Sequence, residues 1–406
     1  MELEKLKSMI SEEEIIDFIT ALVAIPSYSG LENQEKAAAE YIHKTFLKEG
    51  IHSQLIEVKK GRFNVIGALK GTGGGETLLL TGHTDTVPPY DMSDPFTLIE
   101  EKGNLYGRGV VDMKGPLACM IFSLIAIKRA ELELKGDVIF AGVIDEEEGS
   151  LGTIDLIEKG IRADAAIVGE PTDLQICAAH RGLEWFELEF HGKTVHGGKQ
   201  SEGINAILQA SNFIQQCEDE LMPKILEETH PLIGTSSMNY GTIQGGTQPS
   251  TVAGKCVLEI DRRWVPGVRY GEMVKDFEKL IEDLKQKDPK FQCDFQVMAE
   301  SVMKEGYIHE AMEIDLNHRI LSIVKEKTES IIAETPEITA FPAWSDGGLL
   351  SGYSKIPAIV FGPGDLKTAH SKNEHLKKSQ VLPGTLIYAL TAVDFCSFKG
   401  ADSVSP

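Results

Sequence analysis

Paired cysteines are missing from this sequence. Its 6 cysteines are scattered through 406 residues, and no two form a Cys-x-x-Cys motif. This spacing excludes a disulfide framework, disfavours a cysteine-ligated metal site, and predicts buried free thiols in a cytoplasmic protein. The cysteines are Cys119, Cys177, Cys217, Cys256, Cys293 and Cys396.

Positive charge is also scarce. The chain has 40 lysines and arginines against 62 aspartates and glutamates, which gives a net charge of −22. A protein with this balance repels nucleic acids and anionic membranes, so neither is expected as a partner. A handful of metal ligands could not account for the excess, and most acidic side chains are therefore expected on a solvated surface.

Long apolar runs are absent as well. The first 18 residues, MELEKLKSMISEEEIIDF, carry charges throughout, so they are not expected to be a signal peptide. No apolar run approaches the roughly 18–20 residues of a membrane-spanning helix, so no membrane span is predicted.

The most informative stretch is GDVIFAGVIDEEEG, residues 136–149. Its apolar part has the length and flanking glycines of a strand buried on both faces, and it stops at four consecutive carboxylates. Ligands of open α/β sheets bind just beyond the carboxyl ends of strands. Four adjacent acids repel one another unless a cation lies among them. Alone, the acidic run would be read as a solvated turn, but its neighbours in the fold favour a pair of metal ions.

Three further predicted strands are followed by polar side chains. They lie in TLLLTGHTD, DAAIVGEPT and IPAIVFGPG, the last continuing into a loop. We expect all four sets of polar side chains to converge at one edge of the sheet. These side chains are His83 with Asp85, Glu146 with Glu147, Glu170, and His370.

The order of predicted strands and helices over residues 182–303 indicates a separate, inserted domain. The stretch GLEWFELEFHG alternates apolar and acidic residues, as in an antiparallel strand exposed on one face. A helix, two strands, an amphipathic helix and a last strand follow, and this β-α-β-β-α-β order predicts a ferredoxin-like unit. Residues 1–181 and 304–406 are then the two parts of an α/β domain.

Three helices of that domain are predicted from local signals. Ser11 and Glu14 have the spacing of a capping box at the start of a helix. The helix that begins at Pro116 is apolar over most of its circumference and is expected to be buried, and another helix is expected over about 310–328.

Histidines and carboxylates without cysteine suit zinc, or cobalt or manganese in its place. His83 and Asp85 would point the same way from an extended segment, so one could bind a metal while the other orients the imidazole. Each residue alone has an ordinary structural explanation. Asp112, for example, stands before a helix and could be only its cap.

Five segments together resemble the dizinc amidohydrolases typified by acetylornithine deacetylase, succinyl-diaminopimelate desuccinylase, aminoacylase and glutamate carboxypeptidase. The resemblance covers nearly the whole chain, and it implies a zinc-peptidase-like α/β catalytic domain with an inserted ferredoxin-like lid that mediates dimerisation. Each segment is weak alone, but all five in this order are specific. They are TGHTDTVP (81–88), GRGVVDMKG (107–115), DEEEGS (145–150), VGEPT (168–172) and GPGDLKTAHSKNEHL (362–376).

The resemblance implies a role for each site residue. His83 and Glu170 would hold one divalent ion, Glu147 and His370 the other, Asp112 would bridge them, and Asp85 would support His83. Glu146 would be the general base that carries a proton from water to the leaving amine. Glu148 has no assigned role and is expected to be solvated.

Two residues of the predicted lid also match the family. In HGKTVHGGKQSEGINAI (191–207), His196 would stabilise the oxyanion in the active site of a neighbouring subunit of a homodimer. In DRRWVPG (261–267), Arg263 would hold the substrate carboxylate. The alternative for Arg263 is a structural ion pair with Asp261.

The sequence therefore predicts a metal-dependent hydrolase of the amide bond in an N-acyl amino acid, of the acetylornithine deacetylase or succinyl-diaminopimelate desuccinylase type. A di- or tripeptidase or a glutamate-type carboxypeptidase acting on short peptides is the alternative within this class. A non-catalytic peptide-binding relative is the alternative of another class. The presence of every expected ligand and of Glu146 argues against the last alternative.

Overall fold

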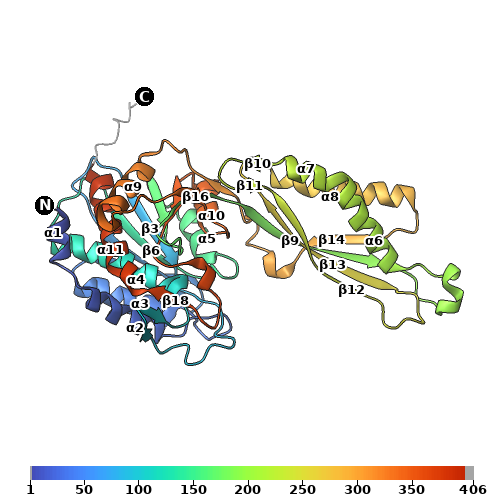
Figure 1. Cartoon of the computed structure of the whole chain (residues 1–406), viewed down its shortest axis with the longest axis horizontal. Helices are drawn as coiled ribbons and strands as arrows, with labels where there is room; N and C mark the ends of the chain where they lie inside the picture. Colours follow the sequence, from blue (N-terminus) through green and yellow to red (C-terminus); the bar gives the residue numbers. More distant parts are fainter. Residues whose placement is uncertain (1, 398–406) are drawn as a thin grey trace. The chain divides into compact units, whose positions relative to one another are not determined.

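A computed structural model describes residues 2–397 and divides them into two compact units (Figure 1). The first unit comprises residues 2–180 and 312–397, and the second comprises residues 181–311. The second unit thus begins one residue before the sequence-based boundary at 182 and ends later than the one at 303.

The first unit is built on a mixed sheet with the strand order β1-β2-β6-β3-β7-β17-β8-β15, in which β16 also pairs with β8. At its centre β6, β3, β7 and β17 run parallel to one another, so their carboxyl ends lie at the same edge. The strands are β1 (His52–Lys59), β2 (Arg62–Leu69), β3 (Leu78–His83), β6 (Val138–Val143), β7 (Ala165–Val168), β8 (Ile176–His180), β15 (Met312–Glu313), β16 (Ile338–Ala340) and β17 (Ala358–Val360).

Helices cover this sheet and bury its central strands. All residues of β3 and β7 are buried, as their continuous apolar runs predict. The helices α3 (Lys36–Lys48), α4 (Gly115–Arg129) and α11 (Val381–Ser397) lie together against it (Figure 1). The predicted burial of α4 is confirmed, because every residue from Gly115 to Ile127 is buried.

The expectation that no apolar run could cross a membrane is corrected by this helix. By length and composition, the stretch Val110–Arg129, which comprises α4 and the residues just before it, would be long and apolar enough. The stretch is buried inside the protein, as in a core helix packed between a sheet and other helices. Its apolar character is thus explained by packing.

The second unit has the predicted β-α-β-β-α-β order. Its antiparallel sheet has the order β12-β13-β9-β14, and α6, α7 and α8 lie along one face (Figure 1). Phe186, Leu188 and Phe190 point into this core, while Glu187 and Glu189 alternate with them. The elements are β9 (Gly182–His191), α6 (Ala206–Gln216), α7 (Met222–Glu227), β12 (Ser237–Gly245), β13 (Lys255–Trp264), α8 (Tyr270–Lys287) and β14 (Cys293–Val297).

Some predicted boundaries change. The helix expected over about 310–328 is α9 (Arg319–Ile332), because β15 and a turn occupy residues 312–318. The Asp315 side chain accepts a hydrogen bond from Asn317 N, and His318 caps the helix by accepting one from Ile320 N. The strand β1 and the helix α11 were not predicted. Within the described residues, the 6 cysteines are free and buried, as predicted.

The remaining elements connect or flank these layers. The helix α2 is capped as predicted, since the Ser11 side chain accepts a hydrogen bond from Glu14 N. The elements are α1 (Glu2–Lys7), α2 (Glu12–Val23), α5 (Leu151–Glu158), α10 (Gly347–Leu349), β4 (Ile99–Glu101), β5 (Asn104–Tyr106), β10 (Thr229–His230), β11 (Gly234–Thr235) and β18 (His375–Lys377).

Candidate metal centre

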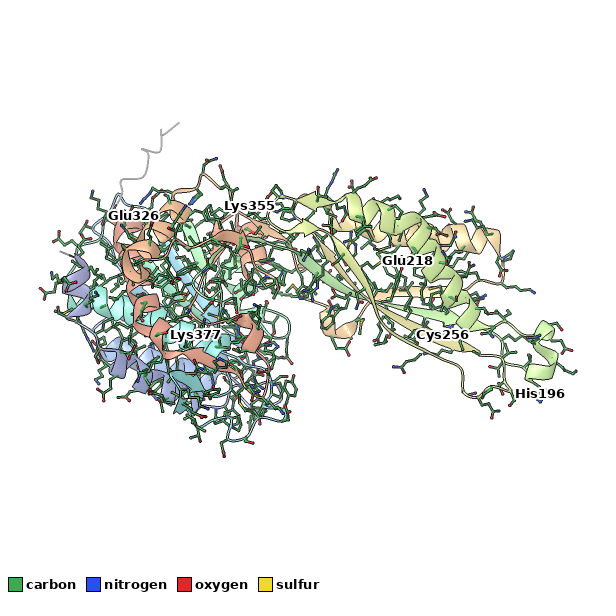
Figure 2. The ribbon with its side chains drawn as sticks, viewed as in Figure 1. His196, Glu218, Cys256, Glu326, Lys355 and Lys377 are labelled. Atoms are coloured by element: carbon green, nitrogen blue, oxygen red, sulfur yellow. The ribbon has the colours of Figure 1, made fainter. Side chains whose placement is uncertain are left out.

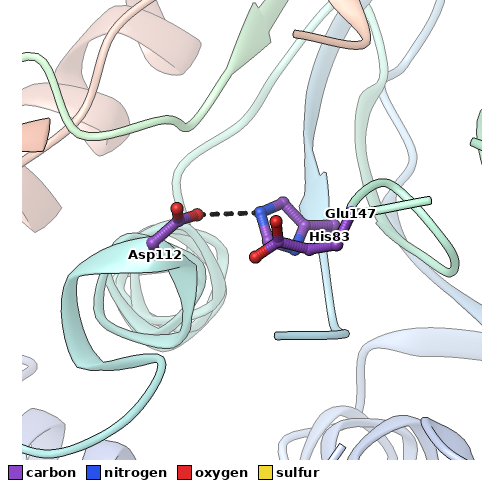
Figure 3. A group of neighbouring side chains, drawn as sticks. All are labelled: His83, Asp112 and Glu147. Atoms are coloured by element: carbon purple, nitrogen blue, oxygen red, sulfur yellow. Dashed lines mark hydrogen bonds and ion pairs between the residues drawn. The ribbon is translucent and has the colours of Figure 1, made fainter. Parts of the chain in front are cut away.

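His83 is the last residue of β3 and is only 1% exposed. Its Nδ1 lies 3.0 Å from the Asp85 carbonyl oxygen and 3.5 Å from Asp85 Oδ1. Its Nε2 lies 3.0 Å from Asp112 Oδ1 (Figure 3). Asp85 thus holds one ring nitrogen and leaves the other directed at the acidic cluster, the usual arrangement behind a metal-binding imidazole.

Asp112 lies between the two histidines. One carboxylate oxygen is 3.0 Å from His83 Nε2, and the other is 3.0 Å from His370 Nε2. The residue precedes α4 in a short segment, Val110–Lys114, whose backbone is not helical at Asp112 itself. A carboxylate with one oxygen turned toward each of two imidazoles is placed as a bridging ligand would be.

Each histidine has its own glutamate. Glu170, which follows β7, places Oε1 3.7 Å from His83 Nε2, and Glu147, which follows β6, places Oε2 3.3 Å from His370 Nε2. His83, Asp112 and Glu147 each offer a ligand atom within 4.8 Å of the others. All five predicted ligands are thereby brought together in the first unit.

Asp85 also organises the loop that carries the candidate base. Its carboxylate oxygens accept hydrogen bonds from the backbone N–H groups of Glu146, at 3.3 Å, and Glu147, at 3.1 Å. Glu147 also accepts one from Val87 N at 3.1 Å. Glu148, expected to be solvated, is exposed, but it accepts a hydrogen bond from Ser29 Oγ.

The cluster holds more negative charge than it can bury without cations. Burial raises the pKa of Glu146 well above its ordinary value and raises the pKa of Glu170 to about 8. Hydrogen bonds to Asp112 and Glu147 raise the pKa of His370 to about 10. The pKa of His83 is raised too: burial opposes the shift, but the hydrogen bonds to Asp112 and Asp85 outweigh it.

The donor set fits divalent transition metals. It consists of two imidazoles and three carboxylates without a thiolate, which suits zinc, cobalt or manganese. Glu170 Oε1 is buried and has no hydrogen-bond partner, a costly state for a carboxylate oxygen unless a cation neutralises it. The residues present therefore fit a metal centre.

The remaining two predicted site residues belong to the second unit. His196 is exposed at the start of a 3-10 segment, Gly197–Glu202, and its Nδ1 accepts a hydrogen bond from Gly198 N (Figure 2). Arg263 lies on β13, and its Nε donates to Asp261 Oδ2 at 3.0 Å. That contact is the structural alternative considered for Arg263, and the binding roles of both residues stay predictions.

Several supporting residues were not predicted. Glu374, at 1% exposure, accepts hydrogen bonds through Oε1 from the backbone of Val111 and Asp112 and is paired with Arg108. Asp346 Oδ2 accepts a hydrogen bond from Thr153 Oγ1 at 2.6 Å. Glu374 stands four residues after His370 within a recognised segment, which could have drawn attention to it. The only sequence feature near Asp346 that could have drawn attention to it is the pair of glycines that follows it.

The mixed sheet, covered by helices, carries a histidine–carboxylate cluster at the carboxyl ends of its parallel strands, an arrangement suited to a metal-dependent hydrolase. The profile of peptidase family M20/M25/M40 matches residues 79–394. The chain belongs to this family of metal-dependent amidohydrolases and peptidases.

Curated relatives match over nearly the full length. The chain is 29% identical to N-formyl-4-amino-5-aminomethyl-2-methylpyrimidine deformylase of Bacillus subtilis, over 96% of each chain. It is 29% identical to acetylornithine deacetylase of Pasteurella multocida, over 94% of this chain and 98% of that one. The aminopeptidase PepT of Bacillus cereus shares the fold, with a TM-score of 0.79, 20% identity, and coverage of 96% and 99%.

Zinc binding should release protons, because zinc competes with them for Glu170 and His370. At pH 7 both groups are protonated in the metal-free protein, given pKa values of about 8 and about 10. The pKa of His83 is raised as well, so we expect at least two protons released per chain when the site fills, and weaker zinc binding as the pH falls. Titration calorimetry in buffers of different ionisation enthalpy measures this number.

The variant Glu170→Gln is the control, since it removes one of these protons and should release about one fewer than the wild-type protein. Binding heats that do not depend on the buffer would contradict this account of the site.

Proposed function

We propose that the chain hydrolyses the amide bond of an N-acyl amino acid with two divalent metal ions, most simply zinc, with cobalt or manganese as substitutes. The observation that carries the proposal is the position of the Asp112 carboxylate. Its Oδ1 lies 3.0 Å from His83 Nε2, and its Oδ2 lies 3.0 Å from His370 Nε2. The glutamate beside each histidine completes two sets of ligands around one shared carboxylate.

His83 and Glu170 would hold one ion, His370 and Glu147 the other, and Asp112 both. When bound, such ions polarise the scissile carbonyl and lower the pKa of the attacking water. Asp85 keeps the His83 ring in the required orientation through its contacts with Nδ1.

Glu146 would act as the general base and then as the general acid. It stands beside Glu147 in the turn after β6, and Glu147 is the residue whose carboxylate faces a histidine, with Oε2 3.3 Å from His370 Nε2. One glutamate can therefore serve as ligand while the other stays free to move a proton. A proton taken from water by Glu146 would be delivered to the leaving nitrogen, which departs as an amine.

The curated relatives support a small acyl group. One is named for removing a formyl group and the other for removing an acetyl group. A formamide on an aminopyrimidine therefore joins N-acetyl and N-succinyl amino acids as a candidate substrate. Short peptides remain the second candidate, because the family also contains peptidases.

The second unit would serve as a lid and as the surface of a homodimer. His196 would reach the partner's active site and stabilise the oxyanion, and Arg263 would hold the substrate carboxylate once it exchanges Asp261 for the ligand. The buried free cysteines support a cytoplasmic location.

A substrate panel tests the proposal directly. Metal-stripped protein should be inactive and should regain turnover of N-acetylornithine or N-succinyl-diaminopimelate when zinc or cobalt is restored. The panel should include a formylated aminopyrimidine and di- and tripeptides. Turnover of peptides alone would reject the deacylase assignment, and a chain that binds no metal would reject the whole proposal.

Replacement of the base should separate catalysis from metal binding. Glu146→Gln should lower kcat by about 10²–10⁴-fold, because the amide cannot accept the proton, and both metals should still bind. Steady-state kinetics with metal analysis would measure this. Glu148→Gln is the matched control, one position beyond Glu147, and should leave kcat within about threefold. Unchanged turnover in Glu146→Gln would sink the mechanism.

Mixing two inactive variants tests the role of His196 across the dimer. Glu146→Gln and His196→Ala should each lose most activity when prepared alone. Random exchange of subunits would place an intact Glu146 opposite an intact His196 in about a quarter of the sites, so that share of activity should return. If His196 acts within its own chain, or not at all, mixing would restore nothing.

A further inference from the structure

The loop after β6 has an unusual backbone where it begins. Asp145, the residue before the candidate base, has φ of 72°, a left-handed conformation that is uncommon outside glycine. Its carbonyl oxygen accepts hydrogen bonds from Gly149 N at 3.0 Å and Ser150 N at 2.6 Å. Such a conformation persists when surrounding contacts fix it, and those contacts are often functional.

Arg62 supplies one of these contacts. The strands β2 and β6 are antiparallel, and Val65 opposite Gly142 is the last pair between them. Arg62 and Asp145 each lie three residues beyond that pair, so the same register continued past it brings them together. Arg62 Nη1 lies 2.6 Å from Asp145 Oδ1. The pairing of these strands thus brings the arginine to the first residue of the loop.

A second carboxylate, that of Glu35, holds the Arg62 side chain. Its Nε donates to Glu35 Oε2 at 2.7 Å, and its Nη2 contacts the other oxygen of the same carboxylate. Glu35 is at the N-terminal end of α3. All three residues are buried, with exposures of 0% for Glu35, 7% for Arg62 and 4% for Asp145.

The same strand holds the loop at a second point. Asn64, at 0% exposure, accepts a hydrogen bond from Ile144 N at 3.1 Å and donates to Gly152 O at 2.9 Å. Side chains from β2 therefore fix both ends of the loop, while Asp85 fixes its middle through the N–H groups of Glu146 and Glu147.

A buried ion network is a poor way to gain stability, because desolvation offsets much of its attraction. A planar guanidinium that contacts two carboxylates does fix direction, since it binds each with defined geometry. The network therefore provides orientation more than stability.

We propose that Arg62, backed by Glu35, is a positioning residue that sets the direction of Glu146 and Glu147 by holding Asp145 in its left-handed conformation. The inference rests on the proposed function for the role of Glu146. The first of the four consecutive acids is then neutralised by an arginine and not by a metal.

Two variants test this role. Arg62→Lys keeps the charge and removes the planar fork. The triple variant Glu35→Gln, Arg62→Met and Asp145→Asn removes the ion network without leaving an unpaired buried charge, and asparagine tolerates the left-handed backbone. Both should fold, as circular dichroism and thermal melting would verify.

The matched control is Arg129, which also joins two carboxylates. Its Nε lies 2.9 Å from Glu49 Oε2 and its Nη2 lies 2.7 Å from Glu14 Oε1. Among residues 2–397, neither carboxylate contacts the loop after β6. The triple variant Glu14→Gln, Glu49→Gln and Arg129→Met repeats the same change there. It should retain kcat and zinc affinity.

The Arg62 variants should lower kcat by about 10–100-fold with a smaller change in KM, and weaken zinc binding by a similar factor. Zinc affinity is measured by competition with a chromophoric chelator, so it does not depend on the substrate. If wild-type protein binds zinc but hydrolyses nothing on the panel, the proposed function fails, while the zinc affinities still test the positioning role. Retention of kcat and zinc affinity within twofold by well-folded Arg62 variants would overturn the proposal.

Discussion

The structure of the first unit depends on the concentration of acidic side chains at one edge of its sheet. Asp85, Asp112, Glu147 and Glu170 lie within reach of two histidines, and burial disfavours the charged forms of the glutamates. Without cations, the two glutamates and His370 retain protons to limit the repulsion. Divalent ions that bind among these carboxylates and histidines replace the protons and relieve the repulsion, so the site favours metal binding.

In this fold the parallel strands carry the site residues, and other buried side chains hold the segments on which those residues lie. Four parallel strands deliver ligands or the base from their carboxyl ends, where backbone geometry changes and side chains can converge. Supporting groups then fix the ligand segments. Glu374 accepts hydrogen bonds from the backbone at Asp112, and Arg62 and Asn64 fix the loop that carries Glu146.

The second unit is held together mainly by apolar packing on one face of its sheet. Its sheet is covered on one face, so its strands alternate apolar and polar residues, and its core consists mainly of aromatic and aliphatic side chains. Phe190, for example, packs against Phe213 and Phe291. Two charged residues, Arg262 and Glu184, are also buried on these strands, with exposures of 1% and 2%. Such a unit can hold binding residues on its exposed loops while its packing stays independent of them.

The sequence by itself determined the buried strands, the alternating strand β9, the amphipathic helix α8 and the set of candidate ligands, because each follows from local periodicity or from a recognisable segment. It did not determine β1, the true start of α9, or the supports of the site. Arg62 reaches Asp145 only through the register of two strands, and Glu374 reaches Asp112 across 262 residues of chain. Contacts of that kind leave no local pattern, so only the tertiary structure could decide them.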